Sequence, residues 1–255
     1  MHIRCICFLL LLTITPACAR AQMTEPCAAV THLDQPYTVC SFDAGSDIRL
    51  WHTNPEGDLF GQFDTLASQL AGSGQTLIFA MNGGMYHEDR RPVGLYVEDG
   101  KQTAPLVTRE GPGNFGMLPN GVFWIDEEGQ PRVTESLAYQ TLAPPARFAT
   151  QSGPMLVIDG ALHPRFNEDG PSRKRRNGVG VSADGKTVYF AISDGSVNFH
   201  SFATLFRDQL GTPNALYLDG YVSKLYAPHL GRNETGLNMG PIVGVTVPQK
   251  QHDTR

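Results

Sequence analysis

Asp219 is the residue of this sequence best placed to do chemistry, because it ends a short apolar run. Residues 214–218 (NALYL) lack the polar alternation of a half-exposed strand and are too short for a helix. They therefore predict a buried strand that delivers a carboxylate at its end. Asp219-Gly220 is also a typical turn pair, and turn formation alone is sufficient to explain it. The segments on either side of this run favour a functional site at Asp219 over a simple turn.

A second carboxylate follows the same pattern. Residues 187–193 (TVYFAIS) predict a strand that ends at Asp194, again followed by glycine. A predicted helix over residues 200–210 joins this strand to the one that ends at Asp219. Two strands joined by one helix can place both carboxylates at one edge of a sheet, where ligands commonly bind.

Another apolar run ends in groups suited to a polar ligand. Residues 76–81 predict a buried strand followed by Asn82-Gly83-Gly84. Paired glycines let the backbone approach a ligand, and the Asn82 amide both donates and accepts hydrogen bonds. An ordinary hairpin turn explains these residues equally well. Ser152-Gly153 forms a similar corner, but Ser152 has no base adjacent in sequence, which disfavours a nucleophilic role.

The basic cluster RKRR at residues 173–176 stands out in an acidic sequence. Such a run is usually a solvated loop. Here Arg176 leads directly into the predicted strand at residues 178–182, so its side chain is positioned to point into a site. A guanidinium group is well shaped to hold a phosphate through two hydrogen bonds.

Several common sites are excluded by the sequence. It contains no G-x-S-x-G elbow, no Walker loop and no H-E-x-x-H helix. Residues 178–183 (GVGVSA) fit a dinucleotide-binding pattern, but a strand follows where that pattern needs a helix. The histidines outside the first 21 residues show no pair at helical ligand spacing, so the sequence specifies no zinc site.

Strands dominate the predicted secondary structure, and few helices interrupt them, which favours an α+β fold over a regular βαβ alternation. We expect a single domain with a mixed, strand-rich sheet core and at least two packed helices. The helices are predicted at residues 58–70, with a stop at Gly72, and at residues 200–210, with Ser201 as cap and Gly211 as stop. Strands are predicted at residues 37–41, 48–52, 76–81, 94–97, 121–125, 155–158, 179–182, 187–193, 215–218 and 242–247.

Residues 1–21 are predicted to be a signal peptide. Arg4 precedes an apolar run of ten residues, and Ala19-Arg20-Ala21 fits a cleavage site. We therefore expect a periplasmic or secreted protein; a lipoprotein anchored through Cys18 is less favoured because the usual upstream leucine is absent. No other segment is apolar enough to be transmembrane. Without the leader, 18 basic side chains face 25 acidic ones, a formal net charge of −7 that argues against nucleic acid as a partner.

Export leaves two cysteines, Cys27 and Cys40. In an oxidising compartment they most simply form one disulfide. We assign residues 22–75 to amino-terminal strands and a helix of the main domain, residues 76–247 to its core, and residues 248–255 to a disordered tail.

The motifs taken together resemble the phosphodiester glycosidase family, in its bacterial exported branch. The resemblance runs from about residue 76 to residue 245. Two motifs depart from the family pattern: its three glycines after the aspartate read Gly220-Tyr221-Val222 here, and its Arg-Thr-Ala reads Arg176-Asn177-Gly178. The matching motifs, in order, are NGGMY at 82–86, P-x-GL at 92–95, SGPML at 152–156, DG at 159–160, RNGVG at 176–180, DG at 194–195 and NALYLDG at 214–220.

The resemblance implies a hydrolase that cuts the bond between a sugar anomeric carbon and a phosphodiester oxygen. It implies catalytic roles for two carboxylates and a cation: Asp219, Asp194 and Arg176. It implies substrate-binding roles for Asn82, Gly83, Gly84, Ser152, Gly153, Asn177, Gly220 and Ser223. A sugar phosphodiester is then the expected substrate. No cofactor is expected to be required, and a divalent cation is the alternative.

Two other readings fit the same residues. The first is a non-catalytic protein that binds an envelope or extracellular anionic glycan through the same groups. The second is a metal-dependent phosphodiesterase in which Asp194 and Asp219 are ligands of a hard divalent cation. The sequence specifies neither the sugar nor the oligomeric state.

Overall fold

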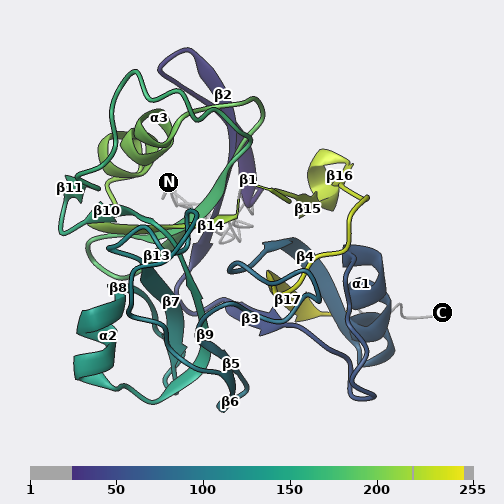
Figure 1. Cartoon of the computed structure of the whole chain (residues 1–255). Helices are drawn as coiled ribbons and strands as arrows, with labels where there is room; N and C mark the ends of the chain where they lie inside the picture. Colours follow the sequence, from purple (N-terminus) through teal and green to yellow (C-terminus); the bar gives the residue numbers. More distant parts are fainter. Residues whose placement is uncertain (1–24, 220, 250–255) are drawn as a thin grey trace, which may run out of the picture.

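Three antiparallel sheets make up the fold, a computed structural model that describes residues 25–219 and 221–249 (Figure 1). The largest sheet has the order β1 (Cys27–His32), β2 (Gln35–Asp43), β13 (Thr187–Ser193), β12 (Asn177–Val181), β14 (Asn214–Asp219), β10 (Met155–Ile158), β11 (Ala161–Leu162). The second has the order β16 (Arg232–Asn233), β15 (Leu225–Ala227), β4 (Gln75–Asn82), β17 (Ile242–Pro248), β3 (Asp47–Trp51). The third has the order β6 (Lys101–Ala104), β5 (Tyr96–Glu98), β9 (Ala146–Ser152), β7 (Gly121–Asp126), β8 (Pro131–Glu135).

This architecture confirms the predicted α+β class, and each predicted strand overlaps an observed one. The expected mixed sheet is wrong in one detail, because every pairing among the described strands is antiparallel. The physical reason is that parallel neighbours need long crossover connections, usually helices, and this chain has few. Strands β13 and β14 do run in the same direction, but β12 lies between them.

The helices begin and end at other residues than predicted. Helix α1 spans Phe63–Gly72, and Leu59, which falls inside the predicted helix range, instead lies in a bridge with Thr53. Helix α3 spans Phe199–Thr204 and continues as a π-helical turn, η1 (Leu205–Gln209). The cap of α3 is Asn198 rather than Ser201, because the Asn198 side chain accepts a hydrogen bond from the Ser201 N–H at 2.8 Å. Two short helical segments were not predicted, α2 (Ser136–Leu142) and η2 (Pro228–Leu230).

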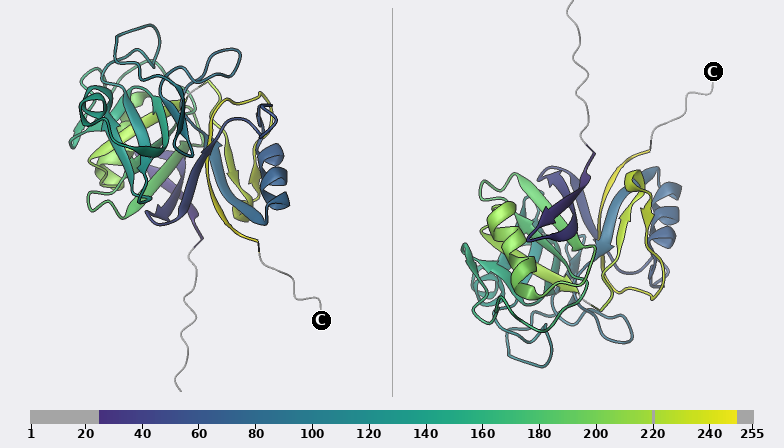
Figure 2. Two further views of the ribbon diagram at one scale, coloured as in Figure 1. Left: turned by 90° about the horizontal axis from the view of Figure 1, so that it is seen from below. Right: turned by 90° about the horizontal axis from the view of Figure 1, so that it is seen from above.

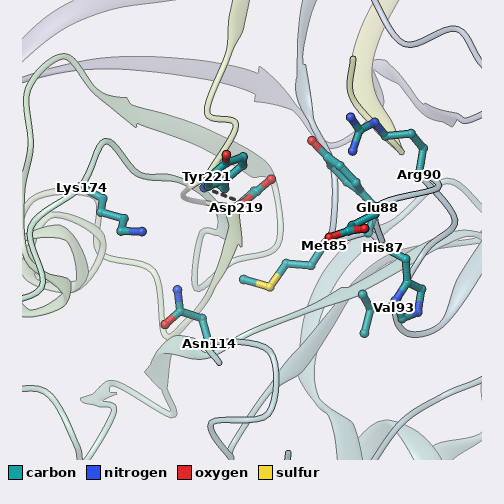
Figure 3. Close-up of a pocket in the computed structure, with 10 residues that line it drawn as sticks. Met85, His87, Glu88, Arg90, Val93, Asn114, Lys174, Asp219 and Tyr221 are labelled. Atoms are coloured by element: carbon teal, nitrogen blue, oxygen red, sulfur yellow. Dashed lines mark hydrogen bonds between the residues drawn. The ribbon is translucent and has the colours of Figure 1, made fainter. Parts of the chain in front are cut away.

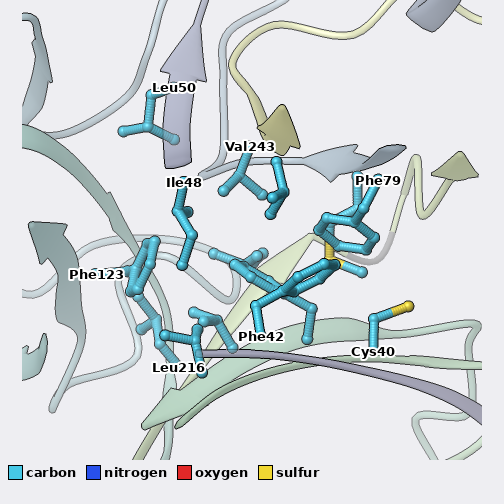
Figure 4. Packing of buried hydrophobic residues seen from close by; sticks show 14 of the residues in the cluster. Cys40, Phe42, Ile48, Leu50, Phe79, Phe123, Leu216 and Val243 are labelled. Carbon is cyan, nitrogen blue, oxygen red and sulfur yellow. The ribbon is translucent and has the colours of Figure 1, made fainter. Parts of the chain in front are cut away.

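The main hydrophobic core lies where the three sheets meet (Figure 4). Phe79 of β4 contacts Phe42 of β2 and Phe190 of β13, with ring centroids 5.1 and 4.9 Å apart. Phe123 of β7 brings in the third sheet, with its ring centroid 5.9 Å from that of Phe190. Because the three sheets share one buried cluster, the ends of β4, β12 and β14 are held in fixed relation to one another.

Each helix covers a sheet face that this core leaves open. Helix α1 packs on the second sheet through Phe63, Leu66 and Leu70, on the side away from the largest sheet (Figure 2). Helix α3 packs on the largest sheet through Phe202 and Ala203. The π-helical turn adds Phe206 to the same cluster.

The predicted disulfide is present. Cys27 and Cys40 are cross-strand partners in the β1–β2 hairpin and are bonded to each other. Replacing both with alanine is expected to lower the free energy of unfolding by about 3 kcal/mol, since the bond closes a loop of thirteen residues in the unfolded chain. Denaturant titration of the variant beside the oxidised parent measures this difference. Coincident unfolding curves would show that the bond adds no stability.

The predictions for the two ends of the chain concern a disordered tail and a signal peptide. The predicted tail begins too early, because Pro248 pairs with Gln75 in β17 and the Gln249 N–H donates to the Gly74 carbonyl at 2.8 Å. The predicted signal peptide, Cys18 and residues 250–255 lie outside the described residues. Within residues 25–219 and 221–249, no helix is both long enough and apolar enough to cross a membrane.

Candidate active site

A cavity of about 350 Å³ lies beside the carboxyl end of β14, with Asp219 in its wall (Figure 3). Two carboxylates, two cationic side chains and a histidine line it, together with aromatic, apolar and amide groups. In Figure 3 Lys174 and Asn114 lie on one side of this cavity, and Glu88, His87 and Arg90 lie on the other. The lining residues are Met85, Tyr86, His87, Glu88, Arg90, Val93, Asn114, Lys174, Asp219 and Tyr221.

Asp219 is held by hydrogen bonds to its backbone and its side chain. Its N–H donates to the Asn177 Oδ1 atom at 3.0 Å, and its carbonyl accepts from the Ser223 hydroxyl at 2.8 Å. Its Oδ1 atom accepts from the Tyr221 N–H at 2.9 Å. The residue is only 8% exposed, so its carboxylate is oriented by the protein and reaches the cavity from the end of a rigid strand.

Asn82 and Asn177, both predicted to bind substrate, lie fully buried behind Asp219 instead. The Asn82 amide donates to Asn177 Oδ1 at 3.2 Å and accepts from the Lys224 N–H at 3.0 Å. The Asn177 amide donates back to the Asn82 carbonyl at 3.2 Å. This pair ties the ends of β4, β12 and β14 together, so its contribution to the site is to position Asp219.

The predicted corner residues also serve packing. A Cβ atom on Gly84 would overlap the Gln151 carbonyl and the Thr150 hydroxyl, and a Cβ on Gly153 would lie 2.7 Å from Asn120 Cβ. These glycines allow one chain segment to approach another rather than a ligand. At Gly83 an added Cβ would lie 3.1 Å from Pro241 Cβ, which is another contact within the protein.

The serines predicted to bind substrate are used inside the protein too. The Ser152 hydroxyl donates to the Leu218 carbonyl at 2.6 Å, and Ser223 donates to the Asp219 carbonyl. Both hydroxyls therefore fix the strand that carries Asp219. Gly220 lies outside the described residues.

Asp194 does not line the cavity with Asp219. Both carboxylates lie at one edge of the largest sheet, as predicted, but β12 separates their strands. The Asp194 carboxylate accepts from the Thr38 hydroxyl at 3.1 Å and forms an ion pair with Arg232 at 2.8 Å. Its surroundings make Asp194 part of a surface ion-pair network, so the predicted pairing of these two carboxylates is corrected.

Arg176, predicted to contact phosphate, is fully buried. Its Nε atom donates to the Val197 carbonyl at 3.0 Å, and one Nη donates to the Ser172 carbonyl at 2.7 Å. Its guanidinium carbon lies 3.5 Å from the ring centroid of Phe199. The Nε atom and one Nη atom are therefore engaged by the fold, while the other Nη atom is buried without a hydrogen-bond partner among the described residues. Its neighbour Lys174 is the member of the basic cluster that lines the cavity.

The cavity residues that the sequence reasoning missed come mostly from the turn after β4. The His87 N–H donates to the Arg91 carbonyl at 2.8 Å, and the Arg90 N–H donates to the His87 carbonyl at 2.8 Å. This turn places Glu88 and Arg90 in the cavity wall. The available signal was the dense charge of HEDRR at residues 87–91, directly after the Gly-Gly pair.

His52 anchors this turn from outside the cavity. Its Nε2 atom donates to the Arg90 carbonyl at 2.8 Å, which requires the proton on that nitrogen. Burial lowers the pKa of His52 more than this hydrogen bond raises it. The folded protein therefore takes up a proton at His52 less readily than the unfolded chain does.

This lowered pKa has a measurable consequence. Because the unfolded chain binds the proton more readily, the free energy of unfolding should fall as the pH drops below the ordinary histidine value of 6.5. Denaturant titrations between pH 7.5 and pH 5 should show a steeper loss for the parent protein than for a His52→Asn variant. Parallel pH profiles for the two proteins would exclude this linkage.

Two tyrosines show that the negative charge of Asp219 acts within this region. Burial raises the pKa of Tyr86, and the Asp219 charge raises it further while Arg90 lowers it. Burial also raises the pKa of Tyr217, which lies two residues before Asp219 in β14, and the Asp219 charge adds to that effect. Burial is thus the main cause of the raised pKa of both tyrosines, and the charge of Asp219 contributes to each.

Metal ligands are not grouped at this site. In the part of the chain that the structure describes, no cluster of three or more His, Cys, Asp or Glu side chains is arranged to hold an ion. Lys174 and Arg90 are the groups of the cavity wall that can attract an anion directly.

The fold is α+β, and its cavity is lined by two carboxylates and two cationic side chains. Comparison with known proteins identifies the family. The family model for phosphodiester glycosidase matches residues 75–242. The chain belongs to the phosphodiester glycosidase family. The uncharacterized protein YigE of Escherichia coli is 37% identical over 181 residues, covering 70% of this chain and 69% of YigE.

Two solved structures share the fold. The catalytic domain of zebrafish N-acetylglucosamine-1-phosphodiester alpha-N-acetylglucosaminidase, auto-inhibited by its pro-peptide, has a TM-score of 0.58 and 16% identity, covering 86% of this chain and 81% of that chain. A protein of Burkholderia pseudomallei described as exported has a TM-score of 0.55 and 13% identity, covering 83% of this chain and 74% of that chain.

Proposed function

We propose that this protein is an exported hydrolase that cleaves a glycosyl phosphodiester at the anomeric carbon. The observation that supports it best is Asp219, held at the end of β14 in a cavity whose other charged groups are Glu88, Arg90 and Lys174. Glycoside hydrolysis generally uses two carboxylates, and we assign the second role to Glu88 in place of Asp194. The membership in the phosphodiester glycosidase family supports the same substrate class.

In the reaction, a water oxygen becomes bonded to the anomeric carbon, one proton of that water passes to a carboxylate of the site, and the bond from that carbon to the phosphate oxygen breaks. The bonding electrons leave with the phosphate, which departs as a phosphate monoester. Asp219 is the carboxylate that acts at the anomeric carbon of the sugar. Glu88 is the second carboxylate that glycoside hydrolysis generally uses. Lys174 and Arg90 stabilise the phosphate charge as it develops.

Lys174 is expected to act mainly in binding. A Lys174→Ala variant should show a KM for the phosphodiester raised about 10-fold, because a charged hydrogen bond is worth roughly 1.5–3 kcal/mol before solvent screening weakens it. Steady-state kinetics at low ionic strength measure the change. Lys186→Ala, which removes an exposed lysine from another turn, is the matched control. An unchanged KM in Lys174→Ala would remove this residue from phosphate binding.

Export is part of the proposal. The disulfide between Cys27 and Cys40 fits an oxidising compartment, and one structural neighbour is described as exported. Residues 1–21 have the pattern of a signal peptide, which supports its removal during export to the periplasm or the medium. Amino-terminal sequencing of protein recovered from the periplasm tests this, and a retained Met1 would contradict it.

The activity is tested with a chromogenic glycosyl phosphodiester beside the matching aryl glycoside that lacks phosphate. Each substrate is assayed with and without a chelator. Cleavage of the phosphodiester in both conditions is the expected result. Binding without turnover across a panel of sugar phosphodiesters would favour the glycan-binding reading, and loss of activity with chelator would favour the metal-dependent one.

A further inference from the structure

A second cavity, of about 200 Å³, adjoins the candidate active site. The two cavities share Asn114 in their walls. One chain segment also borders both, since residues 170–172 line the second cavity and Lys174 lines the first. A group attached to a phosphate beside Lys174 and Asn114 therefore has the second cavity as its nearest enclosed space.

Three of the polar side chains around this second cavity already have partners within the protein, and Asn114 and Asn167 complete its polar lining. The Asn198 side chain caps α3 through Oδ1 and donates to the Glu168 carbonyl through Nδ2 at 2.6 Å. The Ser172 carbonyl and hydroxyl both accept from Arg176. Arg165 is ion-paired with Glu110 at 3.0 Å. These groups have little hydrogen-bonding capacity left for a ligand.

The apolar part of the lining consists of Phe166 and Phe199 beside Met117 and Pro171. The two rings are stacked, with centroids 4.8 Å apart and planes 6° apart. The outer face of Phe166 is covered by His163, and that of Phe199 by the Arg176 guanidinium. Both rings therefore present their edges to the cavity, held rigidly by a four-membered stack.

We propose that this second cavity is the aglycone subsite and that it takes an alkyl or aryl group esterified to the phosphate. This inference rests on the proposed function, because it assumes a phosphodiester beside Lys174. An apolar ligand matches the part of the wall that Phe166, Phe199 and Met117 form. The volume is adequate, since a cavity of roughly 150 Å³ lined by apolar side chains can bind benzene.

The first test compares two substrates that carry the same sugar, a methyl phosphodiester and a benzyl phosphodiester. The benzyl ester should have a kcat/KM at least about 10-fold higher, the scale of discrimination that an apolar pocket provides. An Asn167→Trp variant places an indole at the exposed rim of the second cavity and should abolish this preference while the methyl ester keeps its rate. Gln140→Trp, which adds the same side chain at an exposed position on α2, should keep the preference.

The second test does not depend on turnover. Calorimetry with phenyl phosphate and methyl phosphate should give an affinity for phenyl phosphate at least about 10-fold higher, and Asn167→Trp should remove the difference. Equal affinities, or equal kcat/KM values in the parent protein, overturn the aglycone inference. A preference that persists in Asn167→Trp overturns it as well. If neither diester is cleaved, the proposed function fails, and the calorimetric comparison alone decides the nature of the second cavity.

Discussion

An Asp219→Asn variant is expected to fold normally and to lose roughly 10³-fold in kcat on a glycosyl phosphodiester, the scale typical of removing a catalytic carboxylate. The fold should survive because asparagine has nearly the same shape, and its Oδ1 atom can still accept the hydrogen bond from the Tyr221 N–H. The backbone contacts of Asp219 with Asn177 and Ser223 do not involve its side chain. The change therefore removes the negative charge while these contacts are kept.

Asp194→Asn is the informative comparison for this variant. Asp194 ends β13 at the same edge of the largest sheet, but its carboxylate pairs with Arg232 outside the cavity. An exposed ion pair contributes about 1 kcal/mol or less, so kcat/KM should stay within about 3-fold of the parent value. Thermal unfolding of both variants checks that folding is intact. Equal losses in the two variants would restore Asp194 to the mechanism, and near-parent activity in Asp219→Asn would remove Asp219 from it.

The largest expected effect on stability belongs to Arg176. An Arg176→Met variant loses the hydrogen bonds to the Val197 and Ser172 carbonyls and the stacking of the guanidinium on Phe199. Charged hydrogen bonds are worth roughly 1.5–3 kcal/mol each and a desolvated cation–π contact about 2 kcal/mol. Relief of the cost of burying the charge offsets part of this loss. The free energy of unfolding should fall by about 3 kcal/mol, as measured by denaturant titration.

The matched control is Arg173→Met, because Arg173 belongs to the same basic cluster and is exposed. Its effect on stability should stay within about 0.5 kcal/mol. Kinetics of Arg176→Met at a temperature where it remains folded distinguish the two roles considered for this residue. A loss of kcat/KM below about 10-fold fits the structural role seen in the fold. A loss near 10³-fold with intact folding would show that Arg176 acts on the substrate after all.

The sequence predicted strands well because their apolar runs are short and bounded by turn residues. Residues 215–218 show this clearly: they are buried in a strand that ends at Asp219, as the pattern indicates. Strand β1 was missed because it is short and half of its residues are exposed, and β8 because three of its five residues are charged or polar. The helix limits were wrong where side-chain contacts compete with helical spacing, as at Leu59.

The site was harder to predict, because it depends on which strands become neighbours. Asp219 was identified from its own segment. The insertion of β12 between β13 and β14 separates Asp194 from Asp219, and no local pattern encodes that order. The basic cluster was recognised as unusual, but the sequence does not show which of its side chains faces the cavity. Burial under Phe199 assigns Arg176 to the core, whereas Lys174 lines the cavity.

The central claim is that the bond broken is the one between the anomeric carbon and the phosphate oxygen. Hydrolysis of a glycosyl phosphodiester in ¹⁸O-labelled water, followed by mass spectrometry of both products, tests it most directly. Attack at the anomeric carbon places the label in the released sugar and leaves the phosphate monoester unlabelled. Label in the phosphate product would show cleavage at phosphorus, and would make this protein a phosphodiesterase rather than a glycosidase.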